Sequence, residues 1–220
     1  MKPAERGIKM DGTGGEMGAK LVWYMKALHA RGLITGSGGN ASVRLGGGDE
    51  ILITPSGVYK AELEESDLVR MGLDGKVLDG RWKPSSEWRM HTEIYRKRGD
   101  VNAVIHVHSP YTTGLTIAGR NIGPITPEVA LILPEIEVLE YVCPGTEDLG
   151  RLVGSRIAGK RALILQNHGV VSAGRDLLEA MTAIEVLEEG AITTFVASLM
   201  GGAKVIPKEE VELIKRVYKR

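Results

Sequence analysis

The sequence has little of what marks several classes of protein. Its 220 residues include one cysteine, Cys143, so no disulfide can form within the chain and we expect a cytoplasmic protein. Twenty-eight basic residues balance 28 acidic ones, which argues against nucleic acid or an anionic membrane as a partner. No apolar run reaches the ~18 residues of a membrane span, and the N-terminus lacks the apolar core of a signal peptide.

Side-chain amides are also scarce. The chain has one glutamine, Gln166, and four asparagines. Few thermolabile residues indicate a source that lives at high temperature, whereas the 8 methionines argue in the other direction.

The order of apolar patterns predicts a single domain over residues 1–220. The first ~15 residues are rich in glycine and predict a loose lead-in, and a helix follows from Met17 to Ala30 with Gly32 as its stop. We further expect strands in "EILITPSG", "VNAVIHVHS" and "ALILQNHGVVSAG", a helix after Ser85 and Ser86 with a serine as its N-cap, a helix from Asp176 to about Leu199, and a last helix in "PKEEVELIKRVYKR". Strands with a few intervening helices indicate an α/β or α+β domain.

Two of the five histidines lie one residue apart in the apolar stretch "AVIHVHSP". Alternate side chains of a strand share a face, so His106 and His108 lie about 6.5–7 Å apart along the backbone and can converge on one ion. His168, at the end of another apolar run, is the natural third ligand. Neutral imidazoles suit zinc and related metals, and a catalytic zinc has three protein ligands and an open position. The alternative is a polar pair near a sheet edge.

Glu87 and His91 are four residues apart in a predicted helix. A zinc-protease motif would need the second histidine of HExxH, which is missing here. We therefore expect His91 either on the surface or behind the site.

Three loops, "TGSGGN", "TPSG" and "PSSE", combine small residues with hydroxyl groups. Their hydroxyls and backbone N–H groups can surround a phosphate, helped by the helix N-terminus behind Ser85 and Ser86. None has the Gly-Lys-Ser/Thr ending of a P-loop, and "GSGGNA" lacks the third glycine of the dinucleotide fingerprint. A single loop of this composition is more often an ordinary turn that binds no ligand. Three of them beside a candidate metal site indicate a phosphorylated small substrate.

Together these segments resemble the class II aldolase family, which includes L-fuculose-1-phosphate aldolase and L-ribulose-5-phosphate 4-epimerase. The matching stretches lie within residues 36–171 and read "GSGGNASVR", "LITPSG", "KPSSEWRMH", "NAVIHVHS" and "LILQNHGVV". Within the family, "PSSEWRMH" is most similar to the fuculose-phosphate aldolase branch. The resemblance implies an α/β/α three-layer fold around a central, mainly antiparallel sheet, and a homotetramer with active sites at subunit interfaces.

The resemblance also implies a role for each candidate residue. His106, His108 and His168 would hold zinc, and Glu87 would be the catalytic acid/base and a possible fourth ligand without substrate. The implied phosphate-binding residues are Ser37, Gly39, Asn40, Ser56, Gly57, Ser85 and Ser86. The implied reaction is the reversible cleavage of L-fuculose 1-phosphate, or a close ketose 1-phosphate, to dihydroxyacetone phosphate and L-lactaldehyde or a similar aldehyde, with zinc stabilising the ene-diolate as a Lewis acid.

The chain departs from the aldolase pattern at the residues that would act on the aldehyde half of the substrate. Where the family has a tyrosine from a neighbouring subunit, this chain has Pro127, and the adjacent Glu128 is a candidate acid. A second family tyrosine, near the C-terminus, is matched by Tyr218. The alternatives are an epimerase of the L-ribulose-5-phosphate type, a dehydratase of methylthioribulose 1-phosphate, and a non-catalytic module such as the adducin head. The three histidines and Glu87 favour an enzyme.

Overall fold

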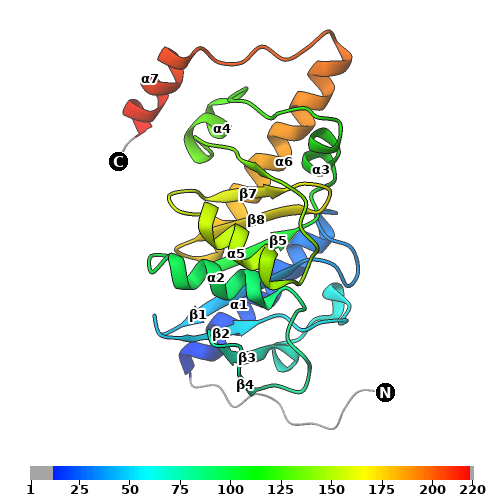
Figure 1. Cartoon of the computed structure of the whole chain (residues 1–220), viewed down its shortest axis with the longest axis vertical. Helices are drawn as coiled ribbons and strands as arrows, with labels where there is room; N and C mark the ends of the chain where they lie inside the picture. The colour runs from blue at the N-terminus through cyan, green and yellow to red at the C-terminus, as the bar shows by residue number, and fades with distance from the viewer. Residues whose placement is uncertain (1–11, 219–220) are drawn as a thin grey trace.

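A computed structural model describes residues 12–218 and contains an eight-stranded sheet (Figure 1). The strands are β1 (Asn40–Leu45), β2 (Glu50–Ile53), β3 (Val69–Gly72), β4 (Val77–Asp79), β5 (Ala103–Val107), β6 (Val138–Leu139), β7 (Ala162–Leu165) and β8 (Gly169–Gly174). Their order in space is β4-β3-β2-β1-β5-β8-β7-β6. All neighbouring pairs are antiparallel except β6 and β7, which confirms the mainly antiparallel sheet.

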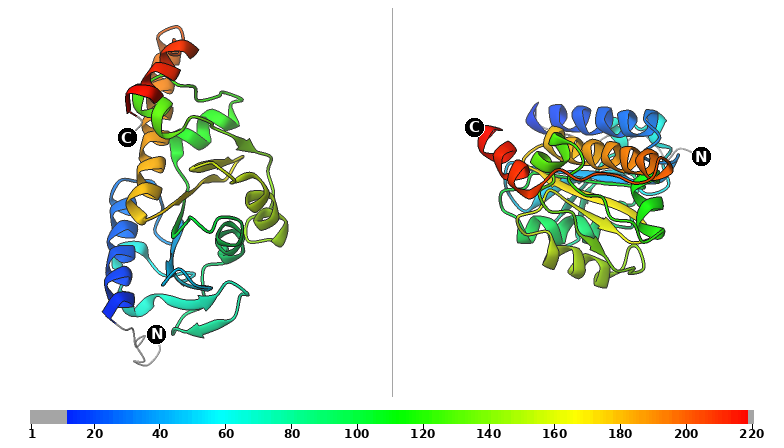
Figure 2. Two further views of the ribbon diagram at one scale, coloured as in Figure 1. Left: turned by 90° about the vertical axis from the view of Figure 1, so that its left-hand side faces the viewer. Right: turned by 90° about the horizontal axis from the view of Figure 1, so that it is seen from above.

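Helices cover both faces of this sheet (Figure 2). They are α1 (Gly12–Ala30), α2 (Trp88–Lys97), α3 (Pro110–Ile117), α4 (Pro127–Ile132), α5 (Glu147–Arg156), α6 (Leu177–Leu199) and α7 (Lys208–Tyr218), with short 3-10 helices at Lys60–Glu62 and Glu65–Asp67. Helices α1 and α6 lie on one face and α2 and α5 on the other, which confirms the three-layer arrangement. None of the helices in residues 12–218 is long and apolar enough to cross a membrane.

The sheet separates two apolar cores, and strand β5 contributes to both. Ile105 and Val107 pack in the core beneath α1 and α6, whereas Val104 packs in the core beneath α2 and α5. Because side chains alternate along a strand, His106 faces the same side as Val104. The histidine pair therefore faces the layer from which α2 begins.

Helix α1 begins at Gly12, earlier than its sequence predicts. Residues 1–11 of the predicted lead-in lie outside the described residues. Helix propensity is a weak guide to where α1 begins, because other contacts stabilise its first turns. Met17 packs against the core, and Glu16 pairs with Lys20 at 2.6 Å. The predicted stop is confirmed: Gly32 has a φ of +70°, and its N–H donates to the carbonyl of His29.

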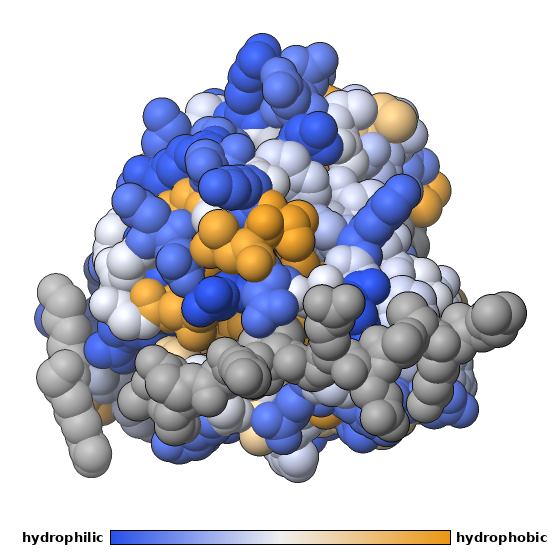
Figure 3. All heavy atoms as spheres, turned by 90° about the horizontal axis from the view of Figure 1, so that it is seen from below, coloured by the Kyte–Doolittle hydropathy of each residue, from blue (hydrophilic) through white to orange (hydrophobic). Residues whose placement is uncertain are grey.

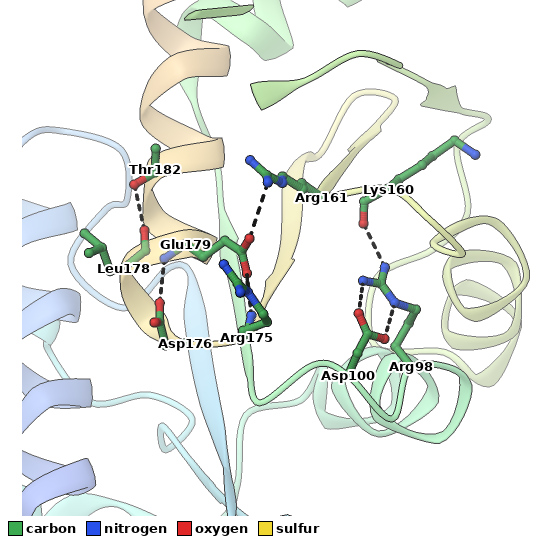
Figure 4. Close-up of polar contacts among 9 residues, drawn as sticks. All are labelled: Arg98, Asp100, Lys160, Arg161, Arg175, Asp176, Leu178, Glu179 and Thr182. Atoms are coloured by element: carbon green, nitrogen blue, oxygen red, sulfur yellow. Dashed lines mark hydrogen bonds and ion pairs between the residues drawn. The ribbon is translucent and has the colours of Figure 1, made fainter. Parts of the chain in front are cut away.

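Polar contacts fix the start of α6 (Figure 4). Asp176 is the N-cap, and its carboxylate accepts a hydrogen bond of 2.8 Å from the Glu179 N–H, which agrees with the predicted start. Glu179 also lies 3.5 Å from the guanidinium of Arg161 at the start of the β7 segment. Ion pairs near the surface contribute little to stability, so we attribute the fixed start of α6 mainly to the Asp176 cap.

The short strand β4 forms one edge of the sheet. It leaves Val77 and Leu78 46% and 39% exposed. Figure 3 looks onto this end of the molecule and shows apolar side chains among hydrophilic ones. An edge strand of three residues offers little backbone for pairing with a second chain.

Candidate active site

The three histidines meet at one end of the sheet. His106 lies in β5, His108 follows that strand, and His168 lies in the turn between β7 and β8. The run "ALILQNHGVVSAG" is thus a hairpin, in which Asn167 takes a left-handed φ of 58°. The ring centroid of His106 lies 5.2 Å from that of His108 and 4.6 Å from that of His168.

The three imidazoles can hold a metal ion. One ligand atom from each lies within 4.8 Å of the others. His106 Nδ1 donates to the Val170 carbonyl at 3.0 Å, which leaves the Nε2 lone pair free for a metal. This Nε2 lies 3.1 Å from Glu87 Oε2, yet in residues 12–218 it has no hydrogen-bond partner, and neither has Glu87 Oε1. Buried polar atoms left without partners around one point fit a cation at that point.

Burial sets the charge of these groups. It lowers the pKa of His168 to about 4 and also lowers the pKa of His108, and His106 adds to both effects. Neutral imidazoles are the form that binds a metal. Burial alone would raise the pKa of Glu87, but His106, His168 and the Asn40 amide hold it well below its usual range, so Glu87 is a carboxylate.

The connection into α2 places Glu87 against the histidines. The predicted serine N-cap is wrong: Glu87 is itself the N-cap residue of α2, and its side chain makes no cap bond. Ser85 Oγ instead accepts a hydrogen bond of 3.3 Å from the Glu87 N–H. Glu87 is 6% exposed, and its carboxylate points at the three histidines, with Oε1 3.5 Å from His168 Nε2.

A buried hydrogen-bond chain holds the Glu87 carboxylate from behind. Asn40 Nδ2 donates to Glu87 Oε2 at 3.0 Å, and Asn40 Oδ1 accepts from His91 Nε2. His91 Nδ1 accepts from Ser42 Oγ at 2.7 Å, and Tyr95 donates to the Ser42 carbonyl at 2.9 Å. His91 is fully buried, which selects the position behind the site over the surface, and burial lowers its pKa to about 3. A neutral His91 thus fixes the orientation of the Asn40 amide.

We expect His91→Leu to lower kcat by about 10- to 100-fold, the range seen when the supporting partner of a site residue is removed. Leucine leaves Asn40 Oδ1 without its donor, so the amide no longer holds Glu87 in one orientation. His91→Gln, which retains an N–H donor, should lose less. Steady-state kinetics with circular dichroism as a folding check would measure this, and an unchanged kcat in folded His91→Leu would contradict the assignment.

The three loops predicted to bind phosphate line one cavity of about 280 Å³ beside Glu87, His108 and His168. All the predicted phosphate residues are in its wall: Ser37, Gly39, Asn40, Ser56, Gly57, Ser85 and Ser86. Gly38, in the same wall, has a steric reason to be glycine, because a Cβ there would lie 2.8 Å from the His108 ring. Asn40 already donates one amide hydrogen to Glu87, which leaves one for a ligand.

The cavity also has a residue in its wall that carried no chemical signal in the sequence. Pro144, from the loop before α5, closes one side of the cavity. Two predicted acids lie elsewhere, since the cavity wall within residues 12–218 includes neither Glu128 nor Tyr218. Glu128 is exposed in the first turn of α4, and Tyr218 is 61% exposed in α7. Within one chain, the structure does not bring either to the histidines.

Glu188 of α6 clamps the turn that follows His108. Its carboxylate is 6% exposed and accepts hydrogen bonds of 2.9 Å from the N–H groups of Tyr111 and Thr112, and of 2.7 Å from the Thr112 hydroxyl. These N–H groups belong to the first turn of α3, where a negative charge is favourable.

We expect Glu188→Ala to lower the free energy of unfolding by about 1–3 kcal/mol, because it leaves buried donors without an acceptor. Glu189 is the matched control, since it is the exposed neighbour on the same helix. Glu189→Ala should change the free energy by less than about 0.5 kcal/mol. Urea unfolding would compare them, and equal effects would contradict the role of the clamp.

Known proteins match most of this chain. A family model of the Class II Aldolase and Adducin N-terminal domain matches residues 19–194. An L-fuculose phosphate aldolase of Methanocaldococcus jannaschii is 41% identical over 181 residues, which are 82% of this chain and 97% of that protein. A 5-deoxy-D-ribulose 1-phosphate aldolase of Bacillus thuringiensis is 32% identical over 199 residues, 90% of this chain and 93% of that protein. A solved structure of an L-fuculose 1-phosphate aldolase superposes with a TM-score of 0.86 at 34% identity and covers 93% of this chain and 97% of its own. The chain therefore belongs to the class II aldolase family and is an enzyme of the lyase class.

Proposed function

We propose that this chain is a zinc-dependent aldolase that reversibly cleaves L-fuculose 1-phosphate, or a close ketose 1-phosphate, to dihydroxyacetone phosphate and L-lactaldehyde or a similar short aldehyde. One observation carries the proposal: a single cavity joins candidate metal ligands, a buried carboxylate and three loops rich in hydroxyl groups. The relatives named as aldolases of two different ketose 1-phosphates support this class of substrate.

His106, His108 and His168 would hold the metal, with Glu87 as a possible fourth ligand without substrate. When bound there, the metal supplies a Lewis acid that disperses negative charge on the substrate oxygens. Zinc suits three imidazoles, and manganese, cobalt or iron are the alternatives for the same ligands.

Glu87 is the proposed acid/base of the reaction. When the bond between C3 and C4 breaks, its electron pair remains on C3, and the C4 hydroxyl loses a proton as the aldehyde forms. For cleavage, Glu87 would first take up a proton from solvent and deliver it to C3, while the proton of the C4 hydroxyl passes to a base on the aldehyde side or to solvent. In the condensation direction the Glu87 carboxylate would remove the proton from C3. The hydroxyls of Ser37, Ser56 and Ser86 would hold the phosphate, so that binding orients C3 toward Glu87.

We also propose a cytoplasmic homotetramer with active sites at subunit interfaces. In that assembly, Glu128 or Tyr218 would act on the C4 hydroxyl in the site of a neighbouring subunit. Exposed apolar side chains support an interface near the end of α6, where Leu199 and Met200 are 70% and 84% exposed. Light scattering should give the mass of four chains, and a monomer would remove the route by which either residue reaches a site.

The proposed function is tested by product analysis on several substrates. The protein, loaded with zinc, is incubated with L-fuculose 1-phosphate, 5-deoxy-D-ribulose 1-phosphate, L-ribulose 5-phosphate and methylthioribulose 1-phosphate, and the products are identified by NMR. We expect dihydroxyacetone phosphate and an aldehyde from one or both of the first two. An epimer from the third, or a dehydrated ketone from the fourth, as the main activity would replace the proposal with that reaction.

A further inference from the structure

Lys60 is a buried cation directly behind the wall of the cavity. It is the first residue of the 3-10 helix Lys60–Glu62 and is only 1% exposed. Its Nζ donates to three backbone carbonyls: Val58 at 3.0 Å, Pro55 at 3.3 Å and Ser37 at 3.5 Å. Three acceptors match the three N–H groups of an ammonium, so the site is built for the charged form of lysine.

The charge of Lys60 is not neutralised by the protein. No carboxylate within residues 12–218 forms an ion pair with it. Burial lowers its pKa to about 8, which shows that the surroundings disfavour the charge. A buried cation is costly to a fold unless something compensates it, and an anion bound in the cavity would do so.

Two of the three carbonyls that the Lys60 Nζ binds, those of Ser37 and Pro55, belong to two different loops of the cavity. Ser37 and Pro55 both lie in the wall, and the Lys60 N–H also donates to the Gly36 carbonyl at 2.7 Å. The wall itself, as far as residues 12–218 form it, contains no lysine or arginine, and its one carboxylate is Glu87. Apart from a metal held by the histidines, a phosphate dianion there would meet only neutral donors, unless positive charge comes from behind the wall.

We propose that Lys60 is a specificity-determining residue: its buried positive charge, acting through the two loops without touching the ligand, makes the cavity selective for phosphorylated substrates. This inference rests on the proposed phosphate site. It names Lys60 as the source of the electrostatic attraction between that site and a phosphate group. Because the wall has no cationic side chain of its own, the charge of Lys60 favours a phosphorylated ligand over an unphosphorylated one, whereas the hydroxyls set the orientation of the ligand.

The test measures the binding of inorganic phosphate to the metal-loaded protein by calorimetry. Lys60→Met should weaken binding by about 10- to 100-fold at low salt, as expected for loss of a nearby buried charge. Lys60→Gln separates charge from structure, because glutamine keeps N–H donors for the loop carbonyls but carries no charge, and we expect the same loss. Lys76→Met, which removes an exposed lysine from the β3–β4 turn, is the matched control and should bind as the wild type does.

Metal content and circular dichroism would be measured for each variant to check metal loading and folding. If Lys60→Met does not fold, the comparison of Lys60→Gln with the wild type decides the result. Phosphate affinity in Lys60→Gln equal to that of the wild type would overturn the inference, since loop structure alone would then suffice. A wild-type protein that binds no phosphate would overturn it as well. Cleavage of the ketose is scored separately by its products, so failure of the aldolase proposal is distinguished from failure of the inference.

Discussion

Glu87→Gln should retain metal at the wild-type stoichiometry and lose turnover by about 100- to 10,000-fold, the range for removal of a general acid/base. Glutamine has nearly the same shape, and its carbonyl can still accept the hydrogen bond that Asn40 donates to Glu87 at 3.0 Å. It cannot take a proton from C3 or return one. The chemistry is therefore lost while the pocket remains.

Metal analysis and kcat for dihydroxyacetone phosphate release measure the two effects separately. Glu189→Gln, an exposed position on α6, controls for the loss of one negative charge and should behave as the wild type does. A metal-loaded Glu87→Gln variant with kcat within about tenfold of the wild type would remove Glu87 from its assigned role.

His108→Ala should lose both metal and turnover. Structural zinc sites with four ligands bind with about 10–16 kcal/mol, or about 3–4 kcal/mol for each ligand, so loss of one ligand weakens binding by roughly 100- to 1,000-fold. In this chain the effect should be at the upper end, because only three histidines have ligand atoms within 4.8 Å of one another in residues 12–218.

Competition with a chromogenic zinc chelator gives the affinity, and turnover is measured at saturating zinc. His29→Ala is the matched control, since His29 lies in α1 against the ring of Tyr59 rather than in the cluster. Zinc affinity in His108→Ala equal to that of the control would show that the three imidazoles are not the metal site.

Local pattern is enough to find the residues that meet in the candidate site. The alternation in "AVIHVHS" correctly placed His106 in a buried strand, and "NHG" placed His168 beside a glycine turn. The loops "TGSGGN", "TPSG" and "PSSE" were expected to share one ligand, and they do line one cavity. In each case the signal lies within a few neighbouring residues: the alternation of side chains along a strand, a residue typical of turns, or a side-chain hydroxyl.

What the sequence did not show depends on contacts between distant segments. The sequence alone does not decide between the two positions of His91, because its burial comes from packing of α2 on β1, where Ser42 lies 49 residues away in the chain. The sequence does not predict a buried Lys60, because lysines are mostly exposed and only the approach of two loops buries this one. The predicted serine N-cap is wrong for the same reason, because the Glu87 side chain lies against histidines from distant segments, with Oε1 3.5 Å from His168 Nε2.

The central claim is that this chain cleaves a ketose 1-phosphate with a metal held by His106, His108 and His168. It is tested most directly by the release of dihydroxyacetone phosphate from L-fuculose 1-phosphate and 5-deoxy-D-ribulose 1-phosphate, before chelation, after it, and after zinc is restored. We expect release that disappears with the chelator and returns with zinc. Release that persists in protein shown to be free of metal, or no release from either substrate by metal-loaded protein, would contradict it.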